Sequence, residues 1–222
     1  MFRPTSAAKT RSGKVVCLVS GGIDSPVAVW LMAKKGLNPV CVYFDNSPFT
    51  DETTRQRAVE AVRKVRQYVS EDIKLYIVPH GADLADLLKN CPRNLTCILC
   101  RRMMYRVAER IALTEGAEAI VTGEIIGEHA SQTLRNLRVE TEALHDVTVL
   151  RPLIGMNKTE VEHLARQIGT FDTSTKPASC CTAPPPQPRT RARFEEVFTA
   201  ERKLDIDSMI ERDLKGSAVV SV

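Results

Sequence analysis

Short, continuous apolar segments recur along the chain and alternate with longer segments of helical periodicity. Val15 to Val19, for example, is an unbroken apolar run of the kind found in strands buried on both faces of a sheet. The pattern predicts strands at residues 15–19, 39–44, 75–78, 119–122 and 147–150. It predicts helices at residues 25–35, 51–69, 82–88, 101–114 and 158–168. Strands separated by helices imply a doubly wound, parallel, five-stranded α/β sheet with right-handed crossovers.

The ends of the chain and one internal segment depart from this alternation. Residues 1–13 are interpreted as a basic leader, and residues 194–222 as a charged, helical tail. Residues 170–193 lack periodicity and hold a run of prolines, so they are predicted to form a loop of the length that usually carries function. The alternating part and this loop are predicted to form one domain, residues 14–193, since 222 residues fill one α/β domain and are short for two.

Composition narrows the class of protein. Hydrophobic residues make up 43% of the chain and charged residues 26%, which is ordinary for a folded globular protein. The longest obvious apolar run, Val27 to Ala33, is far shorter than the roughly 20 residues of a membrane-spanning helix. The first 16 residues are polar and basic, unlike a signal peptide, so the seven cysteines are not expected to form a secreted disulfide framework. We therefore expect a soluble, cytoplasmic protein, and its net charge of +4 permits an acidic partner without requiring one.

One glycine-containing turn stands out at the end of the first predicted strand. Ser20–Ser25 (SGGIDS) follows that strand directly and precedes a helix. In this setting glycines let the backbone approach a phosphate, and the helix N-terminus offers free N–H donors. The segment matches neither the Walker nor the dinucleotide-binding glycine pattern, and the alternative is an ordinary turn with Asp24 or Ser25 as the N-cap. The number of specified residues favours phosphate binding, with ATP as the expected ligand.

This hexapeptide is similar to the signature of the PP-loop ATP pyrophosphatases, which activate a carbonyl oxygen by adenylation and release pyrophosphate. Further segments narrow the resemblance: SPVA at 25–28, PFT at 48–50, RRMM at 101–104, GE at 123–124, ASQTLRNL at 130–137, LRPLIG at 150–155, Lys158, IGT at 168–170 and Cys180-Cys181. Together, over residues 14 to about 193, they resemble the catalytic domain of the ThiI family, the tRNA 4-thiouridine synthetases. The resemblance implies a PP-loop ATPase fold of the HUP, or adenine nucleotide alpha hydrolase-like, type.

The resemblance also implies an activity. Members of the family are ATP-dependent sulfurtransferases that adenylate a uridine near the tRNA acceptor stem and replace its oxygen with sulfur, with a link to sulfur transfer for the thiamine thiazole. The carbonyl oxygen of uracil is a poor leaving group. Transfer of AMP to it creates an ester that a sulfur nucleophile can displace.

The same resemblance assigns roles to individual residues. The residues implied to bind ATP are Ser20, Gly21, Gly22, Asp24, Ser25, Gly123 and Gln132. Asp24 is expected near Mg²⁺, and Lys158 is expected to oppose the charge that develops on phosphoryl transfer. Without the family match, Lys158 would be interpreted as an exposed residue in the first turn of a helix. Cys180 occupies the position implied to carry or attack the transferred sulfur, and the alternative is that it is a metal ligand.

Cys97 and Cys100 form a Cys-x-x-Cys pair that is predicted to lie just before a helix. A single pair cannot complete a zinc site or hold a cluster, so a third or fourth ligand must come from elsewhere, and Cys180 or Cys181 is the natural candidate. A subset that resembles the archaeal members uses three such cysteines for an iron–sulfur cluster and needs no rhodanese domain. An iron–sulfur cluster is therefore the favoured interpretation, while a structural zinc ion and a redox dithiol that resolves a persulfide stay open as alternatives.

Basic residues near the cysteines indicate contact with RNA. There are two arginine clusters: Arg102, Arg106 and Arg110 on one predicted helix face, and Arg189, Arg191 and Arg193 after the prolines. A solvated surface is the alternative, but clusters of this kind suit a phosphate backbone, so tRNA contact is expected. The four histidines share no ligand spacing, and none of them is expected to act in catalysis.

Full-length ThiI proteins carry an N-terminal RNA-binding portion that includes a THUMP domain, whereas the phosphate loop begins here at residue 20. The expectation is a stand-alone form without THUMP and rhodanese domains. In such a form, a separate RNA-binding subunit or a homodimer supplies RNA contacts, or the acceptor is a sulfur-carrier protein or a small molecule instead. The sulfur donor is not identified. Two alternatives retain the ATP site: a PP-loop enzyme that uses ammonia to make an amide or a deazapurine nitrile, and a non-catalytic ATP-binding module.

Overall fold

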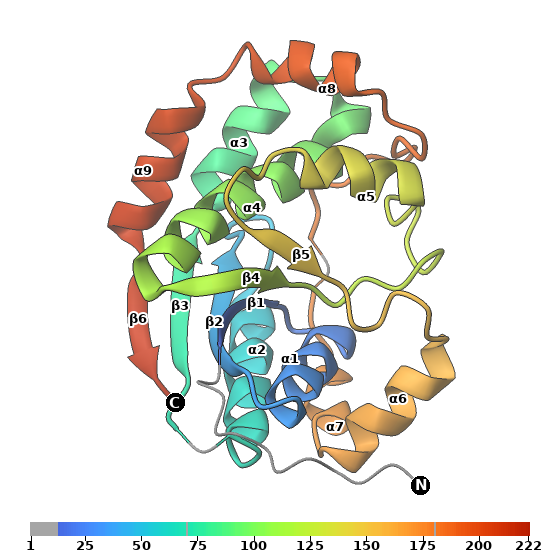
Figure 1. The fold of residues 1–222 in the computed structure, drawn as a ribbon. Helices are drawn as coiled ribbons and strands as arrows, with labels where there is room; N and C mark the ends of the chain where they lie inside the picture. The colour runs from blue at the N-terminus through green and yellow to red at the C-terminus, as the bar shows by residue number, and fades with distance from the viewer. Residues whose placement is uncertain (1–12, 70, 180) are drawn as a thin grey trace, which may run out of the picture.

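The computed structural model describes residues 13–69, 71–179 and 181–222, and it contains a mixed six-stranded sheet with helices on both faces (Figure 1). The strands are β1 (Lys14–Val19), β2 (Asn38–Asp45), β3 (Lys74–Pro79), β4 (Ala117–Val121), β5 (Thr148–Leu150) and β6 (Ala218–Ser221). Their order across the sheet is β5-β4-β1-β2-β3-β6. The first five strands are parallel, which confirms the doubly wound α/β prediction.

The sixth strand is an addition to the predicted five-stranded sheet. It lies in the segment predicted as a helical tail, and it pairs antiparallel with β3 at the edge of the sheet. All four of its residues are exposed. A strand this short shows no periodicity, and its partner lies far earlier in the chain, so local sequence does not reveal it.

Helices connect the strands and cover both faces of the sheet. The α-helices are α1 (Asp24–Lys34), α2 (Glu52–Arg66), α3 (Gly81–Asn90), α4 (Thr96–Glu115), α5 (Leu134–Thr141), α6 (Lys158–Gln167), α7 (Phe171–Ser174), α8 (Phe194–Glu201) and α9 (Ile206–Gly216). A 3₁₀ turn, Arg93–Leu95, precedes α4. Helices α8 and α9 confirm the helical character of the tail, whereas α5 and α7 were not predicted.

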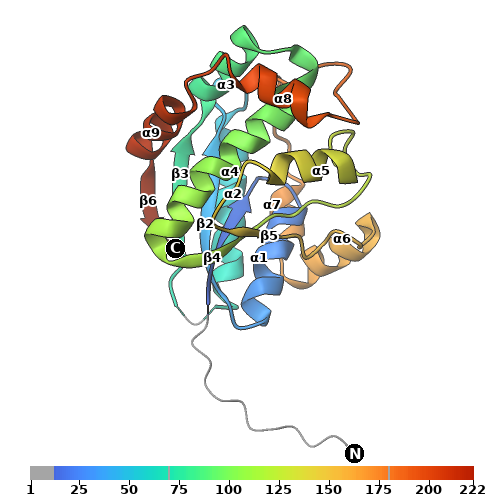
Figure 2. The same ribbon diagram turned by 45° about the horizontal axis from the view of Figure 1, so that its top comes forward.

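Two hydrophobic clusters hold these layers together. Residues of β1 alternate between them: Val16 and Leu18 belong to the cluster that includes residues of α3, α4, α8 and α9. Val15, Cys17 and Val19 belong to the cluster that includes residues of α1, α2 and α6. Figure 2 shows α4 lying over the sheet. This alternation on a central strand is what a sheet buried on both faces requires.

Helix α4 begins earlier than predicted. Its first residue is Thr96, so Cys97 and Cys100 lie in its first turns and not before it. The exposed fractions of Ile98 and Leu99 are 1% and 0%, and both side chains pack in the core. Burial of these two residues extends the apolar face of the helix through the cysteine pair, and the prediction that the pair precedes the helix is wrong.

The fold places a ligand crevice where strand order reverses. Strand β1 lies between β2 and β4, and in open parallel sheets ligands bind beyond the carboxyl ends of strands at such a point. Residues 20–25 form the turn after β1 and the first two residues of α1, and Gly123 follows β4. The helices of the described residues include none with the length and apolar character of a membrane span.

Candidate functional site

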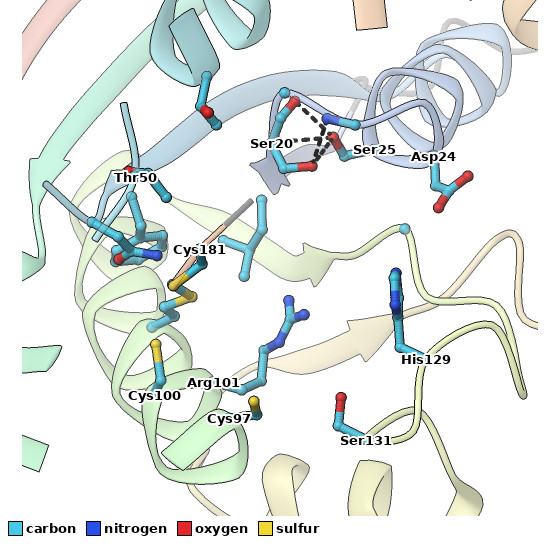
Figure 3. A pocket seen from close by; sticks show the side chains of 18 of the residues that line it. Ser20, Asp24, Ser25, Thr50, Cys97, Cys100, Arg101, His129, Ser131 and Cys181 are labelled. Atoms are coloured by element: carbon cyan, nitrogen blue, oxygen red, sulfur yellow. Dashed lines mark hydrogen bonds between the residues drawn. The ribbon is translucent and has the colours of Figure 1, made fainter. Parts of the chain in front are cut away.

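A cavity of about 650 Å³ lies at the carboxyl ends of the parallel strands (Figure 3). It brings together most of the residues predicted for the site: Ser20, Gly21, Gly22, Asp24, Ser25, Gly123, Gln132, Cys97, Cys100 and Cys181. Figure 3 shows the cysteines gathered at one side of the cavity and the segment from Ser20 to Ser25 at another. Cys180, predicted as nucleophile or ligand, lies outside the described residues.

Hydrogen bonds within the turn at residues 20–25 fix its shape. The backbone N–H of Ser20 donates to Ser25 Oγ at 2.8 Å, and that of Gly22 donates to Ser20 Oγ at 3.2 Å. Ile23 is the residue that precedes α1, and no side chain caps this helix. The alternative in which Asp24 or Ser25 is the N-cap is therefore wrong. Without a side-chain cap, the N–H groups of the first turn are left for an anion.

Gly123 allows the loop after β4 to touch the start of α1. A Cβ at this position would lie 2.9 Å from the backbone nitrogen of Ser25 and 3.0 Å from the carbonyl carbon of Asp24. Any larger residue would push the loop and the helix apart. Gly21 faces a similar limit, because a Cβ there would lie 2.9 Å from the carbonyl oxygen of Thr54.

Lys158 and Asp24 form an ion pair at the edge of the cavity. Lys158 Nζ lies 2.8 Å from Asp24 Oδ1, and the two side chains are 35% and 20% exposed. Each residue is the first of its helix, α6 and α1 respectively. Asn157 caps α6 through a reciprocal pair of hydrogen bonds with Glu160, which fixes Lys158 as the first residue of the helix. Lys158 is thus a partly exposed first-turn residue that is also paired with a residue of the predicted phosphate site.

The segment predicted as a proline-rich loop is bound to the rest of the molecule on both sides of the cysteines. Ser179 donates to Asp51 Oδ2 through its backbone N–H at 2.9 Å and its hydroxyl at 2.7 Å. These bonds lower the pKa of Asp51 to about 2. The backbone N–H of Thr182 donates to the carbonyl oxygen of Phe49 at 2.9 Å. Cys181 is therefore held against the loop that precedes α2.

The block ASQTLRNL at residues 130–137 anchors the later part of the same loop. Asn136 is fully buried, donates to the carbonyl oxygen of Arg189 at 2.7 Å and accepts from the N–H of Ala192 at 2.9 Å. Thr133 donates to the carbonyl oxygen of Thr190 at 2.7 Å. Gln132 Oε1, at the cavity, is buried without a hydrogen-bond partner among the described residues. A buried hydrogen-bond acceptor that lies at a cavity without a protein partner indicates that a bound ligand donates a hydrogen bond to it.

Cys97 and Cys100 project from α4 and Cys181 from the opposite loop. Burial, and then the neighbouring Cys100 and Cys181, raise the pKa of Cys97 to about 11, so three thiolates would repel one another without a cation. The sulfurs around a tetrahedral zinc ion, with Zn–S bonds near 2.3 Å, lie about 3.8 Å apart. Among the described residues, these three cysteines do not all come within 4.8 Å of one another. Thiolates are donors that both a zinc ion and an iron–sulfur cluster accept.

A buried charge network that the sequence did not predict lines the cavity beside the cysteines. Glu124 is 2% exposed and accepts hydrogen bonds from Arg151 Nε at 3.0 Å and from the Tyr105 hydroxyl at 3.2 Å. Arg101 Nη1 lies 3.6 Å from the same carboxylate, and Figure 3 shows Arg101 extending into the cavity. Burial raises the pKa of Glu140, another lining residue, to about 8. In the sequence, the only indication of this network was that Arg101 and Glu124 lie within the RRMM and GE motifs.

The predicted RNA-facing arginines of α4 are not free. Arg102 is 2% exposed, and its guanidinium pairs with Glu201 through two bonds of 2.8 Å. Arg106 pairs with the same carboxylate at 2.7 and 3.0 Å. The prediction that these two arginines face a phosphate backbone is wrong, because they join α4 to α8. Arg110 and the cluster at residues 189–193 are exposed except for Ala192.

One of the four histidines contacts a residue that lines the cavity. His80 is fully buried, and its Nδ1 lies 2.6 Å from Asp213 Oδ2 while its Nε2 lies 3.6 Å from Cys100 Sγ. Asp213 is 133 residues away in the chain, so no spacing could have signalled the pair. The histidine that contacts the cavity cysteine is thus visible only in the folded structure.

A mostly parallel sheet with an SGGIDS turn at its switch point, next to an uncapped helix N-terminus and an aspartate–lysine pair, defines a nucleotide-binding α/β domain of the PP-loop class. The family model described as "Thiamine biosynthesis protein (ThiI)" matches residues 10–206. The chain belongs to the ThiI family.

Curated relatives carry the name "Probable tRNA sulfurtransferase". The one from Methanosarcina mazei is 40% identical over 211 residues, which are 95% of this chain and 52% of the relative. The one from Methanothermobacter thermautotrophicus is 42% identical over 207 residues, which are 92% of this chain and 53% of the relative. The chain thus spans about half the length of the curated relatives it matches.

Solved structures agree with this assignment of the fold. The structure described as "Crystal structure of a 4-thiouridine synthetase - RNA complex with bound ATP" has a TM-score of 0.91 and 36% identity, and the match covers 95% of this chain and 55% of that one. An NMN synthetase from Francisella tularensis has a TM-score of 0.56 at 17% identity over 92% of this chain and 85% of that one, and it shares the fold alone.

Proposed function

We propose that this chain uses ATP to adenylate a carbonyl oxygen of a tRNA uridine, and that sulfur then replaces this oxygen to give 4-thiouridine. The observation that carries the proposal is one cavity lined by residues 20–25 and by Cys97, Cys100 and Cys181. Activation occurs at the oxygen and displacement at the carbon of one carbonyl group, so both groups of residues have to reach the same bound base. The names of the relatives and of the RNA-bound structure support the same acceptor.

The nucleotide end of the cavity supports the first step. The uridine oxygen attacks the α-phosphorus of ATP, the bond to the β-phosphate breaks, and pyrophosphate leaves. N–H groups of the first turn of α1 hold phosphate oxygens, and Lys158 offsets the charge that develops on them. Asp24 fits a Mg²⁺ ion, because its carboxylate lines the cavity and hard oxygens are the ligands that this ion prefers.

The cysteine end supports the second step. We propose that Cys97, Cys100 and Cys181 hold an iron–sulfur cluster, because all three line one cavity and their thiolates need a cationic centre. Such a cluster supplies a site at which a sulfur atom is bound and delivered. Cys180 keeps its proposed role as an alternative ligand or nucleophile, and a redox dithiol of Cys97 and Cys100 is the competing arrangement.

The cysteines that line the cavity also help to decide between the sulfurtransferase and the two alternative functions. Sulfur transfer uses the three cavity cysteines directly, whereas an ammonia-dependent enzyme or a non-catalytic ATP-binding module would use them only to hold a structural metal. The cysteines therefore favour the sulfurtransferase over both alternatives.

RNA contact is proposed to involve a hollow on the surface that is lined by Thr133, Arg135, Thr190 and Arg191. Two exposed arginines beside two hydroxyl side chains are suited to phosphate oxygens. A separate RNA-binding subunit or a second copy of the chain is proposed to add further contacts, and the tRNA acceptor favours a cytoplasmic protein. Native mass spectrometry of the chain with and without tRNA tests these stoichiometries.

The test is anaerobic purification, followed by metal and acid-labile sulfide analysis, an absorption spectrum and a tRNA thiolation assay with ATP and sulfide. The expected result is iron and sulfide in the protein, pyrophosphate release that depends on tRNA, and 4-thiouridine in the product. Nitrogen incorporation without 4-thiouridine would favour the ammonia enzyme. Thiolation by a colourless, iron-free protein would rule out the cluster, and ATP binding without pyrophosphate release would rule out the enzyme.

A further inference from the structure

His80 connects the cavity to the C-terminal helix α9. Its ring lies between two side chains that are distant in the sequence: Asp213 Oδ2 at 2.6 Å from Nδ1, and Cys100 Sγ at 3.6 Å from Nε2. His80 and Asp213 have no exposed surface, whereas Cys100 lines the cavity (Figure 3). The chain of contacts from Asp213 through His80 therefore ends at the sulfur of Cys100, which lines the cavity.

The surroundings of His80 allow its ring one orientation. The backbone N–H of His80 donates to the carbonyl oxygen of Asp45 at 2.8 Å, and the ring meets Phe44 edge-on at 5.3 Å between centroids. The next residue, Gly81, accommodates the carbonyl oxygen of Ser47, which would lie 1.7 Å from a Cβ. Since Asp213 occupies Nδ1, the Nε2 atom is left for Cys100. One proton is shared across that contact, whichever of the two atoms carries it.

A purely structural explanation of this cluster is weak. Asp83 and Asp213 are both fully buried, and among the described residues Asp83 Oδ2 and Asp213 Oδ1 are buried without hydrogen-bond partners. Arg212 offsets part of this charge through bonds to Asp83 at 3.0 and 2.5 Å. A buried polar group of this kind costs stability compared with apolar packing. This loss of stability is explained if the contact between His80 and Cys100 contributes to the function of the cavity.

We propose that His80 is a positioning residue for Cys100 and that Asp213 positions His80. The hydrogen bond between Nε2 and Sγ fixes the direction of the sulfur toward the cavity. Hydrogen bonds to metal-binding sulfurs also tune the bound centre, as partners behind metal ligands generally do. The C-terminal helix α9 is thereby part of the site. The inference rests on the proposed function for what Cys100 does, but the contact itself is tested without it.

The contact is tested in metal-free protein by ¹⁵N NMR of the histidine rings. The chain has four histidines, and the signals of His80 are assigned by their loss in His80→Gln. Cys100→Ala is expected to shift the Nε2 signal of His80 and leave the other three histidines unchanged. Cys91→Ala is the control, because Cys91 contacts the carbonyl oxygen of Ala200 instead. An unchanged Nε2 signal in Cys100→Ala would overturn the proposal.

The consequence for the reaction is tested by comparing two yields, 4-thiouridine and tRNA-dependent pyrophosphate. His80→Leu is expected to lower 4-thiouridine formation about 10- to 100-fold and to leave pyrophosphate release within about twofold. His80→Gln places an amide N–H near the position of Nε2 and is expected to recover part of the loss. Equal loss of both yields, or no loss of either in the folded variant, contradicts the positioning role.

Asp213→Asn provides the second variant, because it preserves the shape of the side chain if His80→Leu does not fold. It is expected to lower the ratio of 4-thiouridine to pyrophosphate in the same direction. Glu211→Gln, an exposed carboxylate on the same helix, is the matched control. If the unmodified protein makes no 4-thiouridine, the proposed function fails while the NMR comparison still decides the inference.

Discussion

The two ends of the cavity are built in opposite ways. The nucleotide end is centred on one short turn, in which Ser20, Gly22 and Ser25 bond to one another across at most five residues. Lys158 and Gly123 then reach this turn from later parts of the chain. The cysteine end is assembled from α4, from the loop that carries Cys181 and, behind them, from His80 and α9. A local turn forms wherever its strand and helix form. The cysteine end exists only when distant parts of the chain have come together.

This difference has a functional consequence. If the two ends are separate, changes at one of them should stop one step of the reaction and spare the other. If the cavity works as one inseparable unit, every change should affect both pyrophosphate release and 4-thiouridine formation. Six substitutions in four experiments, each experiment with a matched control, distinguish these outcomes.

The largest effect is expected from Lys158→Met and Asp24→Ala at the nucleotide end. Loss of one charged group that opposes developing phosphate charge is expected to lower tRNA-dependent pyrophosphate release about 10²- to 10³-fold. Iron content should be unchanged, because neither residue lies among the cysteines. Lys35→Met, at an exposed position just after α1, is the control. Unchanged pyrophosphate release would remove the proposed adenylation site.

The next effect is expected from Cys97→Ser and Cys100→Ser. Each variant is expected to lose bound iron and at least about 90% of 4-thiouridine formation, since each removes a ligand from the proposed centre. Pyrophosphate release should continue, because adenylation uses the other end of the cavity. Cys91→Ser, outside the cavity lining, is the control. Loss of both yields in the cysteine variants, with their fold intact, would show that the two ends are not separable.

A smaller effect is expected from Gly123→Ala, which tests the packing behind the nucleotide end. The added Cβ would come within 2.9 Å of the Ser25 nitrogen, so the loop after β4 must move away from α1. The dissociation constant for ATP, measured by calorimetry, is expected to rise about tenfold, or about 1.4 kcal/mol. Gly155→Ala is the matched control, because nothing lies within 4 Å of a Cβ at that position. Equal affinities for the two variants would contradict this role of Gly123.

The same contrast explains which features the sequence could predict. The five parallel strands and the turn at residues 20–25 depend on neighbouring residues, and their prediction is confirmed. The resemblance to the ThiI family assigned Gly123 and Gln132 to the ATP site, and both residues line the cavity. Periodicity and motif are local signals, so they reach local structure and the residues inside known motifs.

The features that were missed are long-range contacts. Arg102 meets Glu201 across 99 residues, and His80 meets Asp213 across 133. In the sequence an arginine that bonds to RNA and one that bonds to a buried glutamate look alike, and only the fold distinguishes them. The start of α4 was missed for the same reason, because core contacts decide that Ile98 and Leu99 continue the helix.

The smallest effect on activity is expected from Glu201→Gln, which probes how α8 supports the cysteine end through α4. Burial would raise the pKa of Glu201, but hydrogen bonds from Arg102 and Arg106 outweigh it and lower that pKa below its usual value of 4.5. The ionised carboxylate therefore stabilises the fold above about pH 4.5, and this contribution is lost as the pH falls through the lower folded value. At pH 7, Glu201→Gln leaves two arginines without their anion and is expected to lower the free energy of unfolding by about 3 kcal/mol.

Urea denaturation at pH 7 and at several values below 4.5 measures this difference. The gap between the unmodified protein and Glu201→Gln should narrow as the pH falls, while Glu195→Gln, an exposed change on the same helix, should show no gap at any pH. In folded Glu201→Gln protein, pyrophosphate release should match the unmodified protein, because α8 contributes nothing to the nucleotide end of the cavity. A gap that does not depend on pH would mean that Glu201 acts through packing and not through its charge. Reduced pyrophosphate release would mean that the support α8 gives to α4 extends to the phosphate loop, and that the two ends are coupled through the core.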